Sequence, residues 1–178
     1  MPSIAYTTAP TVFGELLLAA TKRGVAALSF GNDELELTAW LQSEFPGLTI
    51  QRDEAGTYQL LADTLEVLDG GGSHSIPLAA EGSDFQKRVW HTLRQIPCGT
   101  TRTYTQLAAM VGQPKAVRAV AGACANNPIS LLVPCHRVVG ADGTLRGYRW
   151  GLERKRRLLE HEARVVQSKQ RSAMARSA

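Results

Sequence analysis

The sequence predicts an α/β protein in which a small N-terminal antiparallel-sheet domain precedes a mostly helical domain with a helix-turn-helix. Three observations predict this fold. Extended apolar runs open the chain, apolar residues at helical spacing follow, and two short helical patterns flank a glycine–proline turn. With 178 residues, 44% of them hydrophobic, the chain can bury the core of one domain or of two small ones.

Three extended segments come first, at residues 4–8, 14–21 and 24–30. The last two flank a short link, which predicts a small antiparallel sheet. Apolar residues at helical spacing then predict helices within residues 37–45 and 61–68. The glycine-rich stretch that follows is the best candidate linker, so we expect one domain at residues 1–80 and a second at residues 81–166.

The second half contains two capping boxes, in which a Ser or Thr is followed three residues later by Gln. Ser83 begins a helix that Pro97 ends, and Thr103 begins another of about two turns. Pro114 suits the first turn of a further helix, and the last two helices together predict a helix-turn-helix. Residues 167–178 lack apolar periodicity and are expected to be a disordered tail.

Composition and charge exclude several classes of protein. No apolar run approaches the ~18 residues of a membrane helix, and the first residues show no signal-peptide pattern, so we expect a cytoplasmic protein. The three cysteines have no repeating spacing and indicate neither a disulfide framework nor a zinc site. Residues 1–80 carry 3 Lys or Arg and 10 Asp or Glu, whereas residues 81–178 carry 17 and 6. A polyanion would therefore be expected to bind the second half of the chain, which is the basic half.

The second helix of the predicted pair has an unusual outer face. At 100° per residue, that face consists of Lys115, Arg118, Ala119 and Gly122. Small side chains let the helix backbone approach the DNA backbone closely and leave one long arginine to probe the groove. This face therefore favours recognition of DNA shape over reading of base edges. The alternative is an ordinary helical pair in which Arg118 is simply solvated.

A polar cluster interrupts the apolar, strand-like run of residues 129–139. It reads Pro134-Cys135-His136-Arg137, and such polar groups are costly there unless they are paired or functional. A neighbouring base favours the thiolate form of a cysteine, which suggests a nucleophile. Consecutive strand residues point to opposite faces, so adjacency does not establish a direct bond and a bridging water is compatible. A buried, inert cysteine is the alternative.

Glu162 lies on the apolar face of a further predicted helix, residues 152–162. On a helical wheel it falls between Leu158 and Leu159, so it should face inward. A carboxylate there needs a partner, and a histidine that it orients and charges is a sensible one. The alternatives are pairing with an arginine among residues 154–157 and snorkelling to water.

Three motifs occur together: PCHRV at residues 134–138, KAVRAV at residues 115–120 and GTLRGYRWG at residues 143–151. They resemble the acceptor motif and flanking signatures of the O6-alkylguanine-DNA alkyltransferases, also called methylated-DNA–protein-cysteine methyltransferases. The resemblance covers roughly residues 1–163 and is weak before Gly82. It implies a ribonuclease H-like N-terminal domain. It also implies direct-reversal repair by a cofactor-free monomer, which moves an alkyl group from O6 of guanine, or O4 of thymine, in duplex DNA to Cys135.

The resemblance further implies roles for individual residues. His136, oriented by Glu162, would take the thiol proton through a water, and Tyr104 would donate toward guanine N3. Arg118 would fill the stack that the flipped nucleotide leaves. The implied DNA-binding residues are Thr105, Lys115, Arg118, Ala119 and Gly122, and the implied pocket residues are Asn127, Val138, Tyr148, Arg149 and Trp150.

Two departures from the family pattern carry expectations of their own. Some relatives hold a structural zinc in the N-terminal domain, but residues 1–80 contain no Cys and one His, so we expect no metal. Arg149 and Trp150 stand where several relatives have small residues, and an indole in the pocket wall would favour methyl over benzyl groups. Two other classes remain open: a helix-turn-helix regulator, which would need base-reading side chains that the helix lacks, and a cysteine hydrolase, whose signatures are missing.

Overall fold

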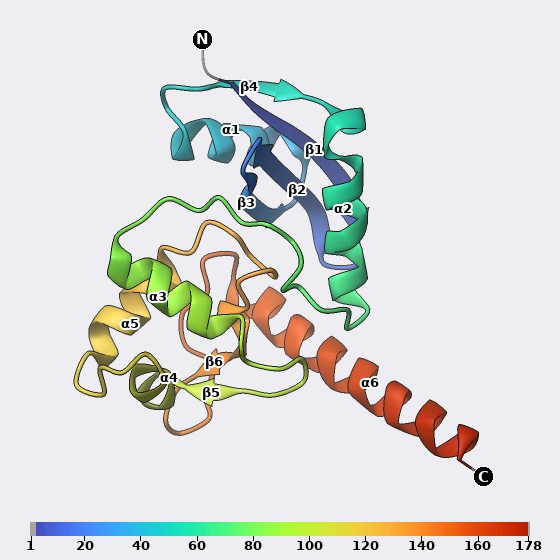
Figure 1. The fold of residues 1–178 in the computed structure, drawn as a ribbon, viewed down its shortest axis with the longest axis vertical. Coiled ribbons are helices and arrows are strands. Elements are labelled where there is room, and N and C mark those ends of the chain that lie inside the picture. The colour runs from blue at the N-terminus through green and yellow to red at the C-terminus, as the bar shows by residue number, and fades with distance from the viewer. Residues whose placement is uncertain (1–2, 178) are drawn as a thin grey trace.

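A four-stranded sheet forms the N-terminal part of the computed structural model, which describes residues 3–177 (Figure 1). Strands β1 (Ser3–Thr11), β2 (Gly14–Thr21) and β3 (Gly24–Gly31) pair antiparallel, as the sequence predicts. Strand β4 (Thr49–Arg52) joins the other side of β1 in parallel, so the sheet is mixed and the expectation of a wholly antiparallel sheet is wrong. Because β4 has four residues and none is buried, it carries no apolar pattern that would predict it.

Two helices cover opposite faces of this sheet. Helix α1 (Glu34–Glu44) starts at the N-cap Asp33, and helix α2 (Glu54–Leu68) starts at the N-cap Asp53. Side chains alternate along β2, which places Leu17 and Ala19 in one core cluster with Leu37 and Leu41 of α1. The residues between them, Leu16 and Leu18, join Val67 of α2 in the second cluster. Both helices expected in this half are confirmed.

The C-terminal part consists of short helices around a small strand pair. Helices α3 (Asp84–Leu93) and α4 (Tyr104–Met110) both begin with the predicted capping boxes. Strand β5 (Arg102–Thr103) pairs in parallel with β6 (Val138–Val139). Helix α5 (Val117–Ala125) begins three residues after Pro114, because residues 113–116 form a separate turn in which Ala116 N donates to Gln113 O at 2.9 Å.

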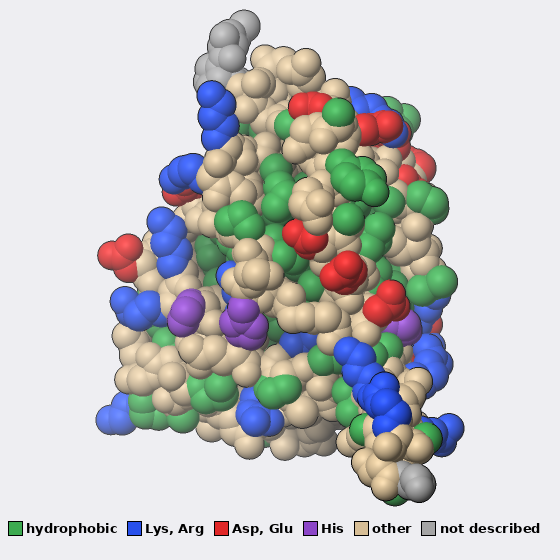
Figure 2. Space-filling view, turned by 45° about the vertical axis from the view of Figure 1, so that its right-hand side comes forward, with side chains coloured by type: hydrophobic (Ala, Val, Ile, Leu, Met, Phe, Trp, Pro, Cys, Tyr) green, Lys and Arg blue, Asp and Glu red, His purple; other side chains and the backbone are tan. Residues whose placement is uncertain are grey.

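Helix α6 (Leu152–Arg176) is 25 residues long and extends past the body of the protein (Figure 1). The expectation of disorder over residues 167–178 is therefore wrong as far as Arg176, and Ala178 lies outside the described residues. The packed first half supplies the nucleus, and adding further residues to a formed helix is far easier than starting one. Figure 2 shows Lys and Arg side chains along the protruding end. Among residues 3–177, no helix is long and apolar enough to span a membrane.

One core runs through both parts of the chain. The larger cluster contains residues of β2 and β3 together with residues of α3, α4, α5 and α6. Leu28 of β3 donates its N–H to Pro128 O at 2.9 Å, and the Trp150 indole donates to Ser29 Oγ at 2.7 Å. The first contact ties the segment after α5 to the sheet, and the second ties the loop before α6 to it. The division of the chain near residue 80, and the ribonuclease H-like description of the sheet, stay predictions.

The Trp150–Ser29 hydrogen bond generates a prediction about stability. Ser29 is 3% exposed and Trp150 is 8% exposed, so the Ser29→Ala variant leaves a buried indole N–H without its acceptor. We expect the free energy of unfolding to fall by about 1–3 kcal/mol, measured by urea denaturation. The control is Ser168→Ala, an exposed serine of α6, for which a change below about 0.5 kcal/mol is expected. Equal stability of the two variants would contradict the assignment.

Candidate active site

Cys135 stands at the start of a short 3-10 helix, η1 (Cys135–Arg137). The strand-like reading of residues 129–139 is therefore wrong except at β6. Leu131 explains the break, because its φ of 64° lies in the left-handed region and turns the chain. The turn is closed by hydrogen bonds from Val133 N to Ile129 O at 3.1 Å and from Cys135 N to Val133 O at 2.8 Å.

Asn127 braces this turn from the inside. Its Oδ1 accepts the Ile129 N–H at 2.9 Å, and its Nδ2 donates to Val133 O at 2.8 Å and to Cys135 Sγ at 3.3 Å. The side chain is fully buried, so all of these bonds are protected from water. Asn127 thus fixes the position of the thiol, and it contacts Cys135 from behind rather than lining the cavity.

The Glu162 carboxylate gathers three partners beneath η1. It accepts a hydrogen bond from His136 Nε2 at 2.8 Å, from Arg137 Nη2 at 2.7 Å and from the Gly99 N–H at 3.1 Å. Arg137 also donates its Nη1 to Ile96 O at 2.5 Å. Glu162 faces inward as predicted, and it pairs with both the histidine and an arginine, although that arginine is Arg137 rather than one of residues 154–157.

The charges in this cluster set the protonation of His136. Burial opposes ionisation of Glu162, but His136 and Arg137 outweigh it and lower the pKa of the carboxyl to about 2. Burial lowers the pKa of His136 despite the opposing effect of Glu162, so the imidazole is neutral at neutral pH. An ionised carboxylate only accepts, so Nε2 must carry the proton. The other ring nitrogen, Nδ1, is buried and has no partner among the described residues, which leaves it free to accept a proton.

Burial raises the pKa of the Cys135 thiol, and the Asn127 amide and the Lys155 charge oppose this only in part. The resting group is therefore a thiol that needs a base to remove its proton. Among residues 3–177, no hydrogen bond joins Cys135 and His136 directly. A bridging water between the thiol and Nδ1 stays a prediction.

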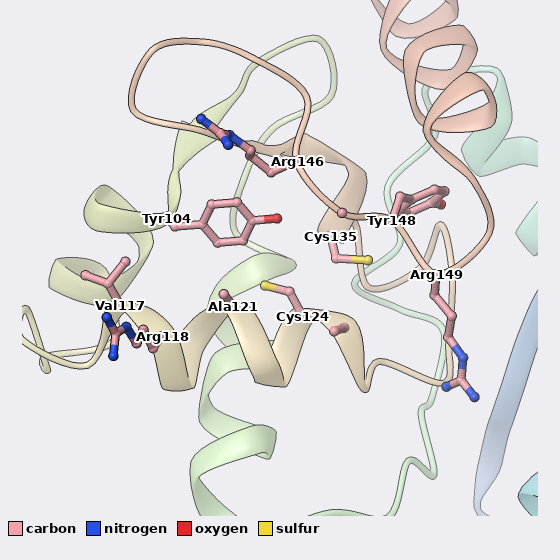
Figure 3. Close-up of a pocket in the computed structure, with 11 residues that line it drawn as sticks. Tyr104, Val117, Arg118, Ala121, Cys124, Cys135, Arg146, Tyr148 and Arg149 are labelled. Atoms are coloured by element: carbon pink, nitrogen blue, oxygen red, sulfur yellow. The ribbon is translucent and has the colours of Figure 1, made fainter.

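The thiol lies in a cavity of about 550 Å³ between α4, α5 and the loop before α6 (Figure 3). The predicted residues that line it are Tyr104, Arg118, Cys135, Tyr148 and Arg149. Figure 3 shows the Tyr104 hydroxyl pointing into the same space as the Cys135 thiol. Burial, and then the nearby thiols, raise the pKa of Tyr104 to about 12, so the hydroxyl keeps its proton and can donate it in a hydrogen bond.

Helix α5 presents the face that its sequence predicts. Val120 and Cys124 are buried, whereas Arg118 and Ala119 are exposed and Gly122 is half-buried. Thr105 is exposed on α4. Lys115 departs from the expectation, because it lies in the turn before α5 and not on the helix itself. A Cβ added at Gly122 would meet no atom within 4 Å, so this face is open to a partner.

Trp150 and Val138, like Asn127, do not line the cavity, although all three were expected in the pocket. The Trp150 indole turns toward the sheet because its N–H finds an acceptor in Ser29. It reaches the pocket only through the Tyr148 ring, whose centroid is 5.2 Å away. Val138 is fully buried in β6, and its carbonyl accepts the Lys155 ammonium at 2.6 Å. In this structure the indole therefore does not form the cavity wall itself.

Lys155 is a residue that the sequence reasoning missed. It is fully buried, and its Nζ also donates to Arg146 O at 2.7 Å, which fastens the pocket loop to β6. The helical wheel that placed Glu162 inward also places Lys155 about 60° from Leu158, on the same face. The signal was present in the sequence. Within residues 3–177, no three His, Cys, Asp or Glu side chains are grouped to hold a metal ion.

Comparison with known proteins connects this site to a family. A family profile described as 6-O-methylguanine DNA methyltransferase, DNA binding domain, matches residues 84–164. The methylated-DNA–protein-cysteine methyltransferase of Methanosarcina barkeri is 40% identical over 84% of this chain and 90% of its own length. The structure of Mycobacterium tuberculosis OGT in complex with DNA superposes with a TM-score of 0.76 at 36% identity, covering 90% of this chain and 94% of that one.

The Escherichia coli transcriptional activator and DNA repair enzyme Ada is 43% identical over 90% of this chain. The match spans only 46% of Ada, so this chain corresponds to about half of that relative. The matched profile contains α3, α4, α5, η1 and Glu162, which are the elements that build the cavity and the charged cluster beneath it. On this evidence the chain belongs to the methylated-DNA–protein-cysteine methyltransferase family.

Proposed function

We propose that the chain repairs alkylated DNA by direct reversal, with Cys135 as the permanent acceptor of the alkyl group. The observation that carries this proposal is a buried thiol in a cavity, with a neutral imidazole and a carboxylate behind it. Family membership supports the same reaction. O4 of alkylated thymine presents a similar alkyl ether beside a ring nitrogen, so the pocket would accept it by the same chemistry.

The reaction is an in-line displacement at the alkyl carbon. Cys135 Sγ forms a bond to this carbon as the bond from carbon to guanine O6 breaks, and the thiol proton passes through a water to His136 Nδ1. Glu162 stabilises the imidazolium that results, as the acid of a nucleophile–base–acid relay does. Tyr104 donates toward guanine N3 and eases the departure of the guanine anion.

Access to the lesion requires the base to leave the duplex. Helices α4 and α5 would act as a helix-turn-helix that presents the small residues of α5 to the minor groove. Arg118, at the edge of the cavity, would enter the stack in place of the flipped nucleotide. The DNA complex of the Mycobacterium tuberculosis relative supports duplex DNA as the partner. A single chain contains every group the reaction needs, so the protein would act as a monomer.

The first prediction concerns stoichiometry. A thioether on Cys135 offers no group that could regenerate the thiol, so repair of O6-methylguanine duplex DNA should stop at one equivalent per protein. Intact-protein and peptide mass spectrometry should place one methyl group on Cys135 alone. The Cys135→Ser variant should bind the same duplex and transfer nothing. Continued turnover, or a methyl group on Cys98 or Cys124, would contradict the assignment.

The second prediction concerns Arg118. The Arg118→Ala variant should react with free O6-benzylguanine as the wild type does, because a free base needs no extrusion. Its rate on alkylated duplex should fall at least ~10-fold, since each 1.4 kcal/mol of lost stabilisation is a factor of ten. The Arg171→Ala variant removes the same charge from the exposed end of α6 and serves as the control. Equal impairment of Arg118→Ala on both substrates would rule out the proposed role.

The third prediction concerns pH. Neutral His136 takes the proton of a neutral thiol, so the single-turnover rate should be flat from pH 6.5, the ordinary histidine pKa, toward pH 9.0, the ordinary thiol pKa. Because the pKa of His136 is lowered, the rate should decline only below pH 6.5. Rapid-quench measurements across this range provide the test. A rate that rises about tenfold per pH unit would show that a preformed thiolate reacts without the base.

A further inference from the structure

Two thiols line the cavity, and the proposed transfer uses only one of them. Cys124 comes from α5 and Cys135 from η1, and both side chains belong to the lining. Figure 3 shows the Cys124 sulfur below the Tyr104 ring and the Cys135 sulfur on the Tyr148 side of the same cavity. Cys124 is 6% exposed and Cys135 is 5% exposed, so both thiols are largely shielded from solvent.

The two thiols influence each other, whereas the third cysteine is separate from them. Burial, and then the neighbouring Cys135, raise the pKa of Cys124. Cys98 does not line the cavity, and it precedes Gly99, whose N–H donates to Glu162. The chain therefore holds one pair of thiols in one cavity and one half-buried thiol elsewhere.

We propose that Cys124 and Cys135 form a dithiol site that captures both ends of a bifunctional alkylating electrophile. This inference rests on the proposed role of Cys135 as the acceptor. The chemical class is an alkyl group that carries a second leaving group, whether delivered from an alkylated base or as a free dihalide. Cys124 is then a second acceptor that closes the adduct inside the protein.

The chemistry needs no oxidant or cofactor. Cys135 Sγ displaces the first leaving group and gives up its proton, which forms one carbon–sulfur bond. The adduct still carries a leaving group on its free end, held inside the cavity next to Cys124. Cys124 Sγ displaces that group and loses its proton, which leaves a bis-thioether bridge and two equivalents of acid when both leaving groups are halides. Without Cys124, the reactive end would remain facing the DNA.

The geometry makes the second step fast compared with reaction between molecules. Once one arm is attached, the other experiences an effective concentration in the mM range, ~1000-fold above protein at micromolar concentration. The rate of bridge formation should therefore be independent of protein concentration. Because Cys124 is buried, little water surrounds the free arm next to it, and hydrolysis of that arm competes weakly.

Dibromobimane tests the proposal on the full chain, because this planar dibromide becomes fluorescent when sulfur has displaced both bromides. We expect one fluorescent equivalent per protein. Trypsin cleaves after Arg118 and Arg137, so the single peptide 119–137 carries both cysteines and should gain the bridge with no free thiol left. Dibromopropane, a smaller and flexible dihalide, should bridge the same peptide. Comparing the two dihalides shows whether the width of the pocket limits entry of dibromobimane.

Substitutions separate the bridge from ordinary labelling. Cys124→Ser and Cys124→Ala should each give a one-arm adduct on Cys135 and lose at least ~10-fold of the fluorescence, because no second thiol is tethered nearby. Cys98→Ser is the matched control and should bridge as the wild type does. Circular dichroism and the thermal midpoint confirm that each variant is folded.

The outcomes distinguish this inference from the proposed function. Transfer from O6-methylguanine duplex is measured on the same preparations. One-arm adducts on the wild type with both dihalides, or a bridge that includes Cys98, would overturn the dithiol site while methyl transfer persists. Absence of methyl transfer would instead overturn the proposed function, and a bridge on peptide 119–137 would then still establish the dithiol site.

Discussion

The buried Glu162 carboxylate is the interaction on which the rest of the site depends. It joins α6 to η1 through His136 and Arg137, and it reaches the segment after α3 through the Gly99 N–H. Removing it would leave the Arg137 guanidinium buried without its counter-ion, which is far more costly than losing an exposed pair. The same carboxylate fixes the proton on Nε2 of His136. Glu162 therefore both neutralises the buried Arg137 charge and sets the tautomer of the proposed base.

Helix α1 and the N-terminal sheet hold the outer wall of the cavity. Arg149 pairs with Glu44 at the end of α1, and its guanidinium lies 5.7 Å from the centre of the Trp40 ring. Trp150 is anchored next to it on Ser29, and the Tyr148 hydroxyl bonds Ser130 at 2.8 Å. Lys155 fastens the same loop from below. Residues of the N-terminal part of the chain thus help to determine where the wall of the pocket lies.

Sequence reasoning succeeded where one residue breaks a strong local pattern. Glu162 stands out on an apolar stripe, and Arg118 stands out among small residues, so both orientations could be predicted. Sequence reasoning failed where contacts between distant residues determine the orientation of a side chain or the conformation of the backbone. Nothing in the local pattern reveals that the Trp150 indole finds an acceptor 121 positions away, or that Leu131 takes a left-handed conformation. The end of α6 was missed because polar residues extend a helix that earlier packing has already started.

The central claim is that Glu162 holds His136 as a neutral imidazole with its proton on Nε2 and a free Nδ1. The most direct measurement is nitrogen-15 NMR of the His136 ring in the full chain at about pH 7, assigned by comparison with His136→Gln. We expect a protonated Nε2 and an unprotonated Nδ1. A proton on Nδ1, or on both nitrogens, would contradict it, because the ring could not then receive the proton of Cys135.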